Sequence, residues 1–306
     1  MARVGAWTYK RGMQVDNNFP TKLFTVDDVP EPFRGTLKDN LSPNEPVLLI
    51  YSPAFTTLQD LPAGSAPVNV GRTLIPATVL AVTDDRWLVA TEGEDGVTVE
   101  QSGFSDTLFL ELTSILLSAE LKIYYASVDT HYVATVHFNT VREEVYREAI
   151  GLILDGIDQK ESTSYDHFAP VLSTWPLKYR LEAERYRPKG QRLITATRWT
   201  SVDSERNGAL CPSGALLITE GELLAISEQK ALPRRHPGDL HKFGGIITYC
   251  PLIRLSDFHI GRHGHFSVLT LLTHAPHASD KLKIVFPSDR EKAVFKTMQC
   301  ALRNKY

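Results

Sequence analysis

Histidine is the residue type most unevenly distributed along the chain, and it is the first candidate for chemistry. Seven of the ten histidines fall between residues 236 and 277. In the stretch HIGRHGH, His259, His263 and His265 surround a glycine turn, so their imidazoles could converge on one metal ion. Zinc sites use three or four such ligands. The spacing therefore suggests a metal site, and the simpler alternative is a hairpin tip where neutral histidines are polar surface residues.

A second candidate is the basic segment QKALPRRHPGDLHK at 229–242. Arginine offers bidentate geometry to phosphate and lysine offers a point charge, so the segment could bind a phosphoanion or an anionic lipid headgroup. Two arginines on or after a nearby strand could join it. The candidate residues of this ligand-binding site are Arg198, Arg206, Lys230, Arg234, Arg235 and Lys242. The alternative is a solvated loop that its two prolines keep out of the sheet.

Signatures of nucleophilic or phosphate-transfer catalysis do not occur in the sequence. There is no GxSxG, no Walker-type glycine loop and no HExxH. The adjacent carboxylates Asp84 and Asp85 are typical of a turn, and Glu143 and Glu144 are typical of a helix start, where the positive end of the helix dipole favours them. We therefore expect no catalytic residues, no cofactor and no enzymatic activity. A metal-dependent enzyme built on the histidine-rich region 236–277 is the enzymatic alternative.

Composition and charge narrow the class of partner. The 306 residues carry a net charge of −3, with 42% hydrophobic and 23% charged residues. This balance does not favour a nucleic-acid partner. No apolar run approaches the roughly 18 residues of a membrane span, and the N-terminus lacks the apolar core of a secretory signal. The three cysteines form no CxxC pair. We expect a cytoplasmic protein with reduced thiols and no transmembrane segment.

An internal repeat determines how these candidate residues are positioned. Residues 76–92 and 212–228 match at an offset of 136. The matched pairs are Pro76 and Pro212, Leu80 and Leu216, Thr83 and Thr219, Leu88 and Leu224, and Glu92 and Glu228. Three further blocks match in the same order at offsets of 145 to 148. The offset changes in connecting loops, where insertions cost little free energy. We therefore predict two copies of one domain, at 26–157 and 171–306.

Both copies have the same predicted order of elements. A short helix comes first, at 30–40 and 176–186, followed by an apolar strand in VLLIYS at 47–52 and RLITAT at 192–197, an offset of 145. A hairpin with a short acidic turn follows each strand. The hairpin strands are Thr78–Val82 with Trp87–Ala90, and Gly214–Ile218 with Leu223–Ile226.

Each copy ends in an amphipathic helix after further strands. The spacing of Thr140 with Glu143, and of Ser288 with Glu291, predicts a capping box at the start of each helix. Strand–helix–strand alternation, which would indicate a parallel sheet, does not occur. The pattern predicts a mainly β protein in which one helix closes each set of antiparallel strands.

The hairpin pattern, AVTDDRWLVA at 81–90 and LITEGELLAI at 217–226, resembles that of bacterial pleckstrin-homology-like (PH-like) and GRAM-type domains. The resemblance implies two bent antiparallel barrels, each closed by a C-terminal helix, that serve as binding or scaffolding modules. The second copy departs from the pattern. Glu222 stands where the first copy has Arg86, and Gly190 stands where it has Glu45.

Three functions follow from these observations. The leading hypothesis is a non-enzymatic tandem binding module for a protein partner, which would dock in the groove or at the edges between the two barrels. The first alternative is recognition of an anionic lipid headgroup or phosphoanion by the basic loop of the second copy. The second alternative is the metal-dependent enzyme. The most distinctive candidate residues, the histidines and the basic loop, belong to the second copy alone.

Overall fold

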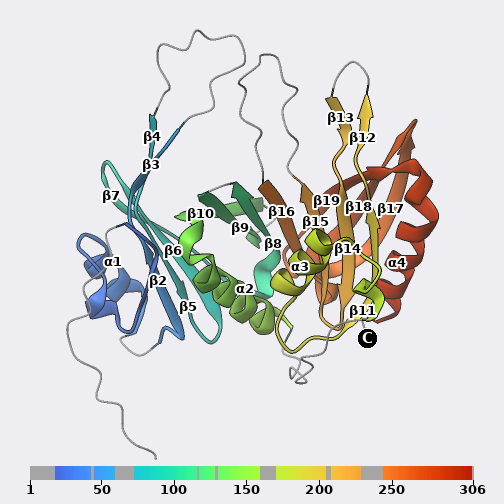
Figure 1. The fold of residues 1–306 in the computed structure, drawn as a ribbon. Helices are drawn as coiled ribbons and strands as arrows, with labels where there is room; N and C mark the ends of the chain where they lie inside the picture. Colours follow the sequence, from blue (N-terminus) through green and yellow to red (C-terminus); the bar gives the residue numbers. More distant parts are fainter. Residues whose placement is uncertain are drawn as a thin grey trace, which may run out of the picture.

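The computed structural model describes residues 18–42, 45–58, 72–115, 117–127, 130–158, 170–204, 208–228 and 244–304. These residues form a mainly β structure of antiparallel strands with four α-helices, as the sequence predicts at the level of fold class. The helices are α1 (Phe33–Asn40), α2 (Glu143–Ile157), α3 (Leu177–Tyr186) and α4 (Glu291–Arg303). Figure 1 shows α1 at one end of the molecule and α4 at the other, with α2 and α3 between them.

The first repeat contributes a five-stranded sheet and three further strands. The sheet has the order β1-β2-β5-β6-β7. Its strands are β1 (Thr21–Leu23), β2 (Leu48–Ser52), β5 (Thr78–Val82), β6 (Arg86–Gly93) and β7 (Gly96–Gly103). The further strands are β8 (Thr107–Ile115), β9 (Ser118–Ser127) and β10 (Thr130–Asn139). A small side hairpin consists of β3 (Phe55–Leu58) and β4 (Arg72–Ile75).

The second repeat has the same order of elements. Its first four strands are β11 (Leu193–Trp199), β14 (Gly214–Thr219), β15 (Glu222–Glu228) and β16 (Gly244–Pro251). They are followed by β17 (Leu255–His263), β18 (Phe266–Ala275) and β19 (Ala278–Pro287). The side hairpin consists of β12 (Val202–Ser204) and β13 (Gly208–Cys211). Both predicted central hairpins are present, as β5–β6 and β14–β15.

The two repeats agree in register down to a bulge. β8 pairs irregularly with β9 between Thr107 and Phe109, and β17 pairs irregularly with β18 between Leu255 and Asp257, at an offset of 148 in both cases. The sequence match fails in the first strand. Leu48 pairs with Val82, and Thr195 pairs with the equivalent Ile218, so the true offset there is 147 and not 145. A register shift between Leu193 and Thr195 accounts for one residue of this displacement.

The predicted closed barrels are not formed. Strands of both repeats instead share one seven-stranded sheet with the order β10-β9-β8-β16-β15-β14-β11. The junction is the antiparallel pair β8–β16, which runs from Gly244 opposite Ile115 to Tyr249 opposite Leu110. Because the outer edge of β8 is occupied by the second repeat, the first repeat does not close on itself.

Helix α2 covers the junction between the repeats. Its buried side chains belong to one hydrophobic cluster with Leu110 and Leu112 of β8 and with Ile247 and Tyr249 of β16. All four of these strand residues are at most 2% exposed. The helix therefore completes the core of the first repeat and shares one hydrophobic cluster with strands of the second, and Figure 1 shows it between the two repeats. Arg185 of α3 donates to the buried carboxylate of Glu143 on α2 at 2.9 Å and links the two helices.

A buried arginine fastens the same junction at its end. Arg254 is 9% exposed and lies in the short turn η5 (Leu252–Arg254) after β16. Its guanidinium donates to the carbonyl oxygens of Thr107 at 3.0 Å and Phe104 at 2.9 Å, which belong to the first repeat. The Phe104 carbonyl also accepts from the N–H of Thr107, so the guanidinium adds a second, charge-assisted bond to it.

The predicted closing helices are present, but their starts differ from the predicted capping boxes. Each helix is preceded by one turn of 3-10 helix, η3 (Thr140–Arg142) or η6 (Ser288–Arg290). In the first, the side chain of Asn139 accepts from the N–H of Val141. In the second, Ser267 donates to the Glu291 carboxylate at 2.6 Å. Both glutamates that were expected to cap their helix therefore bond to groups outside it, since Glu143 accepts from Arg185.

We expect Gly156→Ala to destabilise the protein, because α2 approaches the ring of Phe104 closely at this position. A Cβ on Gly156 would lie 2.3 Å from Cδ2 of Phe104, which is buried. The clash should lower the free energy of unfolding by about 1–3 kcal/mol.

Gly151→Ala in the same helix is the matched control. A Cβ there meets nothing within 4 Å, so it should raise stability by up to about 1 kcal/mol. Urea denaturation measures both, and equal effects would contradict this packing.

Candidate functional site

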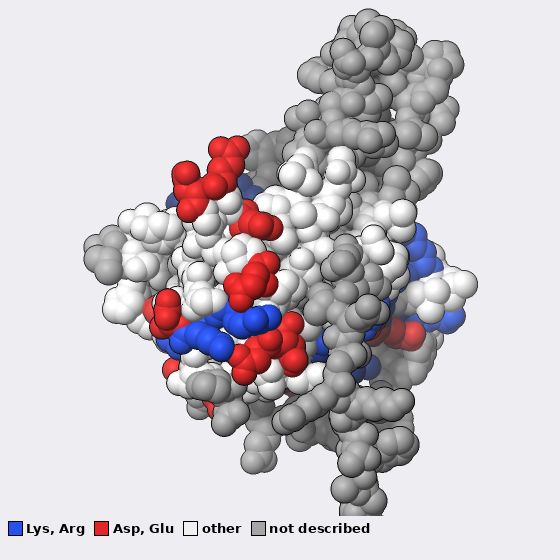
Figure 2. All heavy atoms as spheres, turned by 90° about the vertical axis from the view of Figure 1, so that its left-hand side faces the viewer, with Lys and Arg blue, Asp and Glu red and all other residues white. Residues whose placement is uncertain are grey.

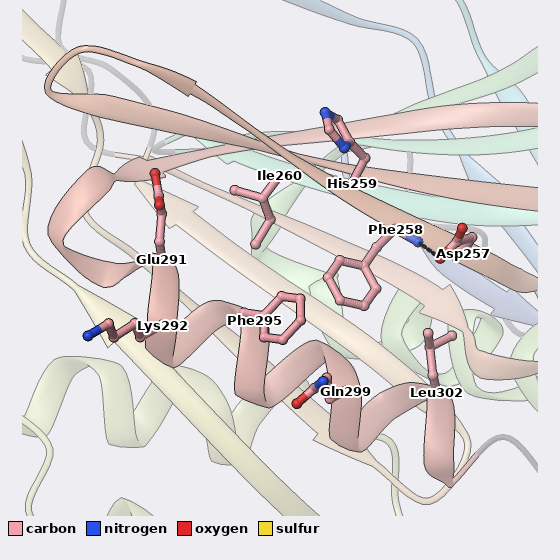
Figure 3. A pocket seen from close by; sticks show the side chains of 9 residues that line it. All are labelled: Asp257, Phe258, His259, Ile260, Glu291, Lys292, Phe295, Gln299 and Leu302. Carbon is pink, nitrogen blue, oxygen red and sulfur yellow. Dashed lines mark hydrogen bonds between the residues drawn. The ribbon is translucent and has the colours of Figure 1, made fainter.

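An open groove of about 660 Å³ lies between β17 and α4 in the second repeat (Figure 3). Its lining residues are Asp257, Phe258, His259, Ile260, Glu291, Lys292, Phe295, Gln299 and Leu302. Because side chains alternate along a strand, Phe258 and Ile260 point toward α4 while His259 extends from the other side of β17, as Figure 3 shows. One wall of the groove is therefore a strand and the other is a helix face.

The floor of the groove is apolar. The rings of Phe258 and Phe295 meet edge to face, with centroids 5.6 Å apart. Phe295 remains 47% exposed, which is high for a phenylalanine in contact with another aromatic ring. Figure 3 shows the Lys292 side chain directed away from the two rings, so the charge lies at the rim. The arrangement suits an apolar guest with polar or acidic groups at its margin.

The strand that forms one wall has an unpaired edge. Among the described residues, β17 pairs with β18 alone and ends the three-stranded sheet β17-β18-β19. An edge strand presents a row of backbone N–H and C=O groups to which another strand can bond. The groove and this edge are adjacent, so one extended segment could occupy both.

The equivalent position in the first repeat is filled. At the offset of 148, Phe258 and Ile260 correspond to Leu110 and Leu112 of β8, which are 0% exposed. They are covered because β16 pairs with β8 along its outer edge and α2 packs over the junction. The groove beside β17 is thus the second repeat's version of a position that a strand occupies in the first.

The histidines of the predicted metal site come only partly together. His259 and His263 lie on one face of β17, and a Cβ on Gly261 between them would be 3.8 Å and 3.6 Å from their Nε2 atoms. His265 lies in the turn after the strand. The described part of the chain contains no group of three or more His, Cys, Asp or Glu side chains arranged to hold a metal ion. The geometry therefore gives the metal-site hypothesis no support.

The predicted anion site falls mostly outside the described residues. Arg206, Lys230, Arg234, Arg235 and Lys242 all lie outside them. Arg198 is described, on the edge strand β11, where its backbone pairs with Ala215. The anion site therefore stays a prediction from sequence.

The hairpin signature has a structural explanation. In each repeat a threonine hydroxyl donates to the carbonyl three residues on and accepts from the N–H of that residue. The distances are 3.0 and 3.1 Å for Thr83 with Arg86, and 3.1 and 3.0 Å for Thr219 with Glu222. The threonine thus holds the tight turn closed, which is why it recurs in both copies.

The residue three positions after the shared threonine differs in charge between the repeats: it is Arg86 in the first and Glu222 in the second. In the first, Arg86 donates to the Glu45 carboxylate at 2.6 Å. In the second, Glu222 is 1% exposed and one of its carboxylate oxygens, Oε1, has no hydrogen-bond partner among the described residues. Burial raises the pKa of Glu222 to about 7, and the nearby Asp158 and Asp155 at the end of α2 act in the same direction. The departure seen in the sequence therefore places a protonatable acid inside the protein.

The groove was not anticipated from the sequence. Its one sequence signal is Phe295, an aromatic residue on α4 where α2 has Arg147 at the same offset of 148. Arg147 donates to the Arg185 carbonyl of α3 at 3.0 Å, so in the first repeat this position contacts the neighbouring repeat. A polar contact in one copy and an exposed aromatic ring in the other indicate that the two copies face different surroundings.

Comparison with known proteins does not assign the chain. No protein-family model matches it, and no curated protein matches its sequence. No helix among the described residues is long and apolar enough to cross a membrane.

We expect Glu222 to make stability depend on pH. The Glu222 carboxyl group has its ordinary pKa of 4.5 in the unfolded chain and a pKa of about 7 in the folded protein. Between these values the unfolded chain has lost the proton that the folded protein keeps, so stability falls as pH rises, by roughly 3 kcal/mol in total, and then levels off. Glu222→Gln should remove most of the difference in unfolding free energy between pH 5 and pH 8. Glu220→Gln, in the same turn and partly exposed, should leave it unchanged. An unaltered pH profile in Glu222→Gln would contradict the assignment.

Proposed function

We propose that this protein is a non-enzymatic binding module of two PH-like repeats that captures an extended segment of a protein partner. The binding site is the free edge of β17 together with the groove between β17 and α4. The partner adds a strand antiparallel to β17 and directs alternate side chains into the groove. Backbone hydrogen bonds to β17 supply part of the affinity, and the apolar groove selects the side chains.

The observation that supports this proposal most strongly is that the equivalent strand edge in the first repeat, on β8, is already paired with a strand. There, β16 pairs with β8 and turns Ile247 and Tyr249 toward α2. The same relation in the second repeat calls for a strand with large apolar side chains two residues apart, facing α4. The chemistry of the partner segment therefore follows from a pairing that the protein already makes.

The exposed apolar surface supports the same conclusion. Phe295 is 47% exposed, while its neighbours Phe258 and Ile260 are partly buried. Covering the exposed part of a phenylalanine contributes about 1 kcal/mol, and covering the strand residues adds to this. The equivalent Leu110 and Leu112 show that residues in this position become fully buried once a strand is in place.

The order of elements supports the PH-like assignment of each repeat. Apart from β1 and the two side hairpins, each repeat has four strands that include the signature hairpin, then a sharp 3-10 turn, three more strands and one helix. The turns are η2 (Phe104–Asp106) and η5, at an offset of 148. Folds of this kind serve many functions, so the proposed activity rests on the groove and on the strand edge rather than on the fold.

A peptide with the β16 sequence tests the site directly. We expect a fluorescently labelled Gly244–Pro251 peptide, with serine in place of Cys250, to bind the full chain saturably in an anisotropy titration. Phe295→Asp should weaken binding at least tenfold, because the substitution places a charge in the apolar groove. Phe24→Asp, which alters a phenylalanine that is 63% exposed and directly follows β1 in the first repeat, should bind like the unmodified protein. Binding that is absent, or equal in both variants, would overturn the proposal.

A further inference from the structure

The vacant edge of β17 has a counterpart at the other end of the molecule. β7 is the strand of the first repeat that corresponds to β16 at the offset of 148, and it ends the five-stranded sheet. In the second repeat that strand pairs with β8, whereas β7 pairs with β6 alone among the described residues. An open crevice of about 400 Å³ borders β7 along Val99–Gly103. Among its described strands, each molecule therefore has a free edge on β17, where a strand could add, and a free edge on β7, the counterpart of the strand that adds to β8 within the molecule.

We propose that β17 of one molecule pairs with β7 of a second copy of this chain, so that the molecules associate head to tail. The proposal rests on the proposed function, in which β17 accepts a strand, and it identifies that strand. The contact repeats between molecules the junction that β8 and β16 form within one. It is heterologous, because different surfaces of the two copies meet.

The internal junction specifies the register of the contact. Gly244 lies opposite Ile115 and Tyr249 opposite Leu110. Subtracting 148 from the β16 residues and adding 148 to the β8 residues gives Gly96 opposite His263 and Gln101 opposite Phe258. Between these ends, Val99 lies opposite Ile260 and Glu100 opposite His259. This register is a definite expectation that other pairings of the two strands do not share.

Two of the pairs that this register brings together are complementary, whereas Gln101 takes the position of Tyr249 and places a polar amide beside Phe258. Val99 is a partly buried apolar residue, and it would lie beside Ile260 on the face toward α4, as Ile247 lies beside Leu112 within the molecule. On the other face, the Glu100 carboxylate would lie opposite the exposed imidazole of His259. Neighbouring positions on facing strands interact at this distance, so both pairs favour the contact.

Charge on the two ends agrees with head-to-tail pairing and disfavours pairing of two β7 edges. Acidic residues gather on β6, β7 and their turn: Glu92, Glu94, Asp95 and Glu100. Figure 2 looks onto the side of the molecule that carries α1 and β7, and Asp and Glu side chains form several groups there. Cationic or protonatable residues gather on β17 and its turn: His259, Arg262, His263 and His265. Two β7 edges would bring like charges together, whereas β17 carries the acidic Asp257 as well as Arg262.

The contact between molecules should be weaker than its internal template. Within the molecule, Arg185 of α3 bonds to Glu143 of α2, and the matching residue of α1 is Asp39, at the offset of 146. A second copy would therefore lack this ion pair. The two strands of the internal junction belong to one chain, so each experiences a high effective concentration of the other. Strands on separate molecules lack this advantage. Association should consequently grow with protein concentration.

Site-specific cross-linking tests the register and the direction of pairing. Glu100→Cys and His259→Cys are prepared separately in full chains that also carry Cys300→Ser, because Cys211 and Cys250 are buried. We expect a short bismaleimide to join the two variants when they are mixed and to leave each variant alone without a covalent link. The matched control replaces His259→Cys with Lys283→Cys, an exposed position on the opposite edge strand, β19, and should not link to Glu100→Cys.

The outcomes separate this proposal from the proposed function. Links within a single variant, or with the Lys283→Cys control, would overturn head-to-tail pairing. No link in the mixture, while the β16 peptide still binds at Phe295, would refute the second copy as partner and leave the strand-binding function standing. If neither a cross-link nor peptide binding is observed, the head-to-tail contact and the strand-binding function are both refuted.

A charge exchange gives an independent readout. Light scattering over a range of protein concentrations should show the association constant falling at least threefold in Glu100→Lys. It should recover when His259→Glu is added to the same chain, since opposite charges then face each other. Glu94→Lys makes the same charge change in the turn beside β7 and should have less effect. Recovery that fails, or an equal loss in Glu94→Lys, would contradict the register.

Discussion

The antiparallel pairing of β8 with β16 is the interaction on which the rest of this structure depends. It joins strands of two repeats into one sheet, so that residues of both repeats lie on a single apolar face. One helix, α2, then serves as the closing helix of the first repeat and as the cover of the second. Because Arg254 bonds to two backbone carbonyls across this junction and Arg185 of α3 bonds to Glu143 of α2, separating the repeats would expose buried backbone acceptors and a buried carboxylate.

The same pairing makes two similar repeats unequal. Each repeat has an acceptor strand, β8 or β17, and a donor strand, β7 or β16. In the junction, the donor β16 pairs with the edge of the acceptor β8. The junction uses the acceptor of the first repeat and the donor of the second, which leaves one edge of the acceptor β17 and one edge of the donor β7 unpaired among the described strands. Backbone hydrogen bonds contribute little to specificity, so the selectivity of such an edge comes from the side chains beside it. In the second repeat these are the aromatic residues of the β17–α4 groove.

Local features of the fold could be predicted from the sequence, and the site could not. The central hairpins are present because alternating apolar strands and a threonine-closed turn are encoded within about ten residues. The spacing of His259 and His263 did place both imidazoles on one face of a strand, as alternation requires. The capping boxes failed because Glu143 and Glu291 found partners on other elements. The groove was missed because Phe258 and Phe295 are brought together by strand–helix packing across 37 residues.

The sequence by itself determined the mainly β class, the repeat, the hairpins and the closing helices. Each of these depends on hydrophobic periodicity or turn chemistry, which act between near neighbours. The tertiary structure alone decided that the barrels stay open, that β8 pairs with β16 and that α2 covers both repeats. The partner of a strand edge is not written in its side-chain pattern, because every strand offers the same backbone donors and acceptors. Only packing of the whole chain determines which edges are filled and which stay unpaired.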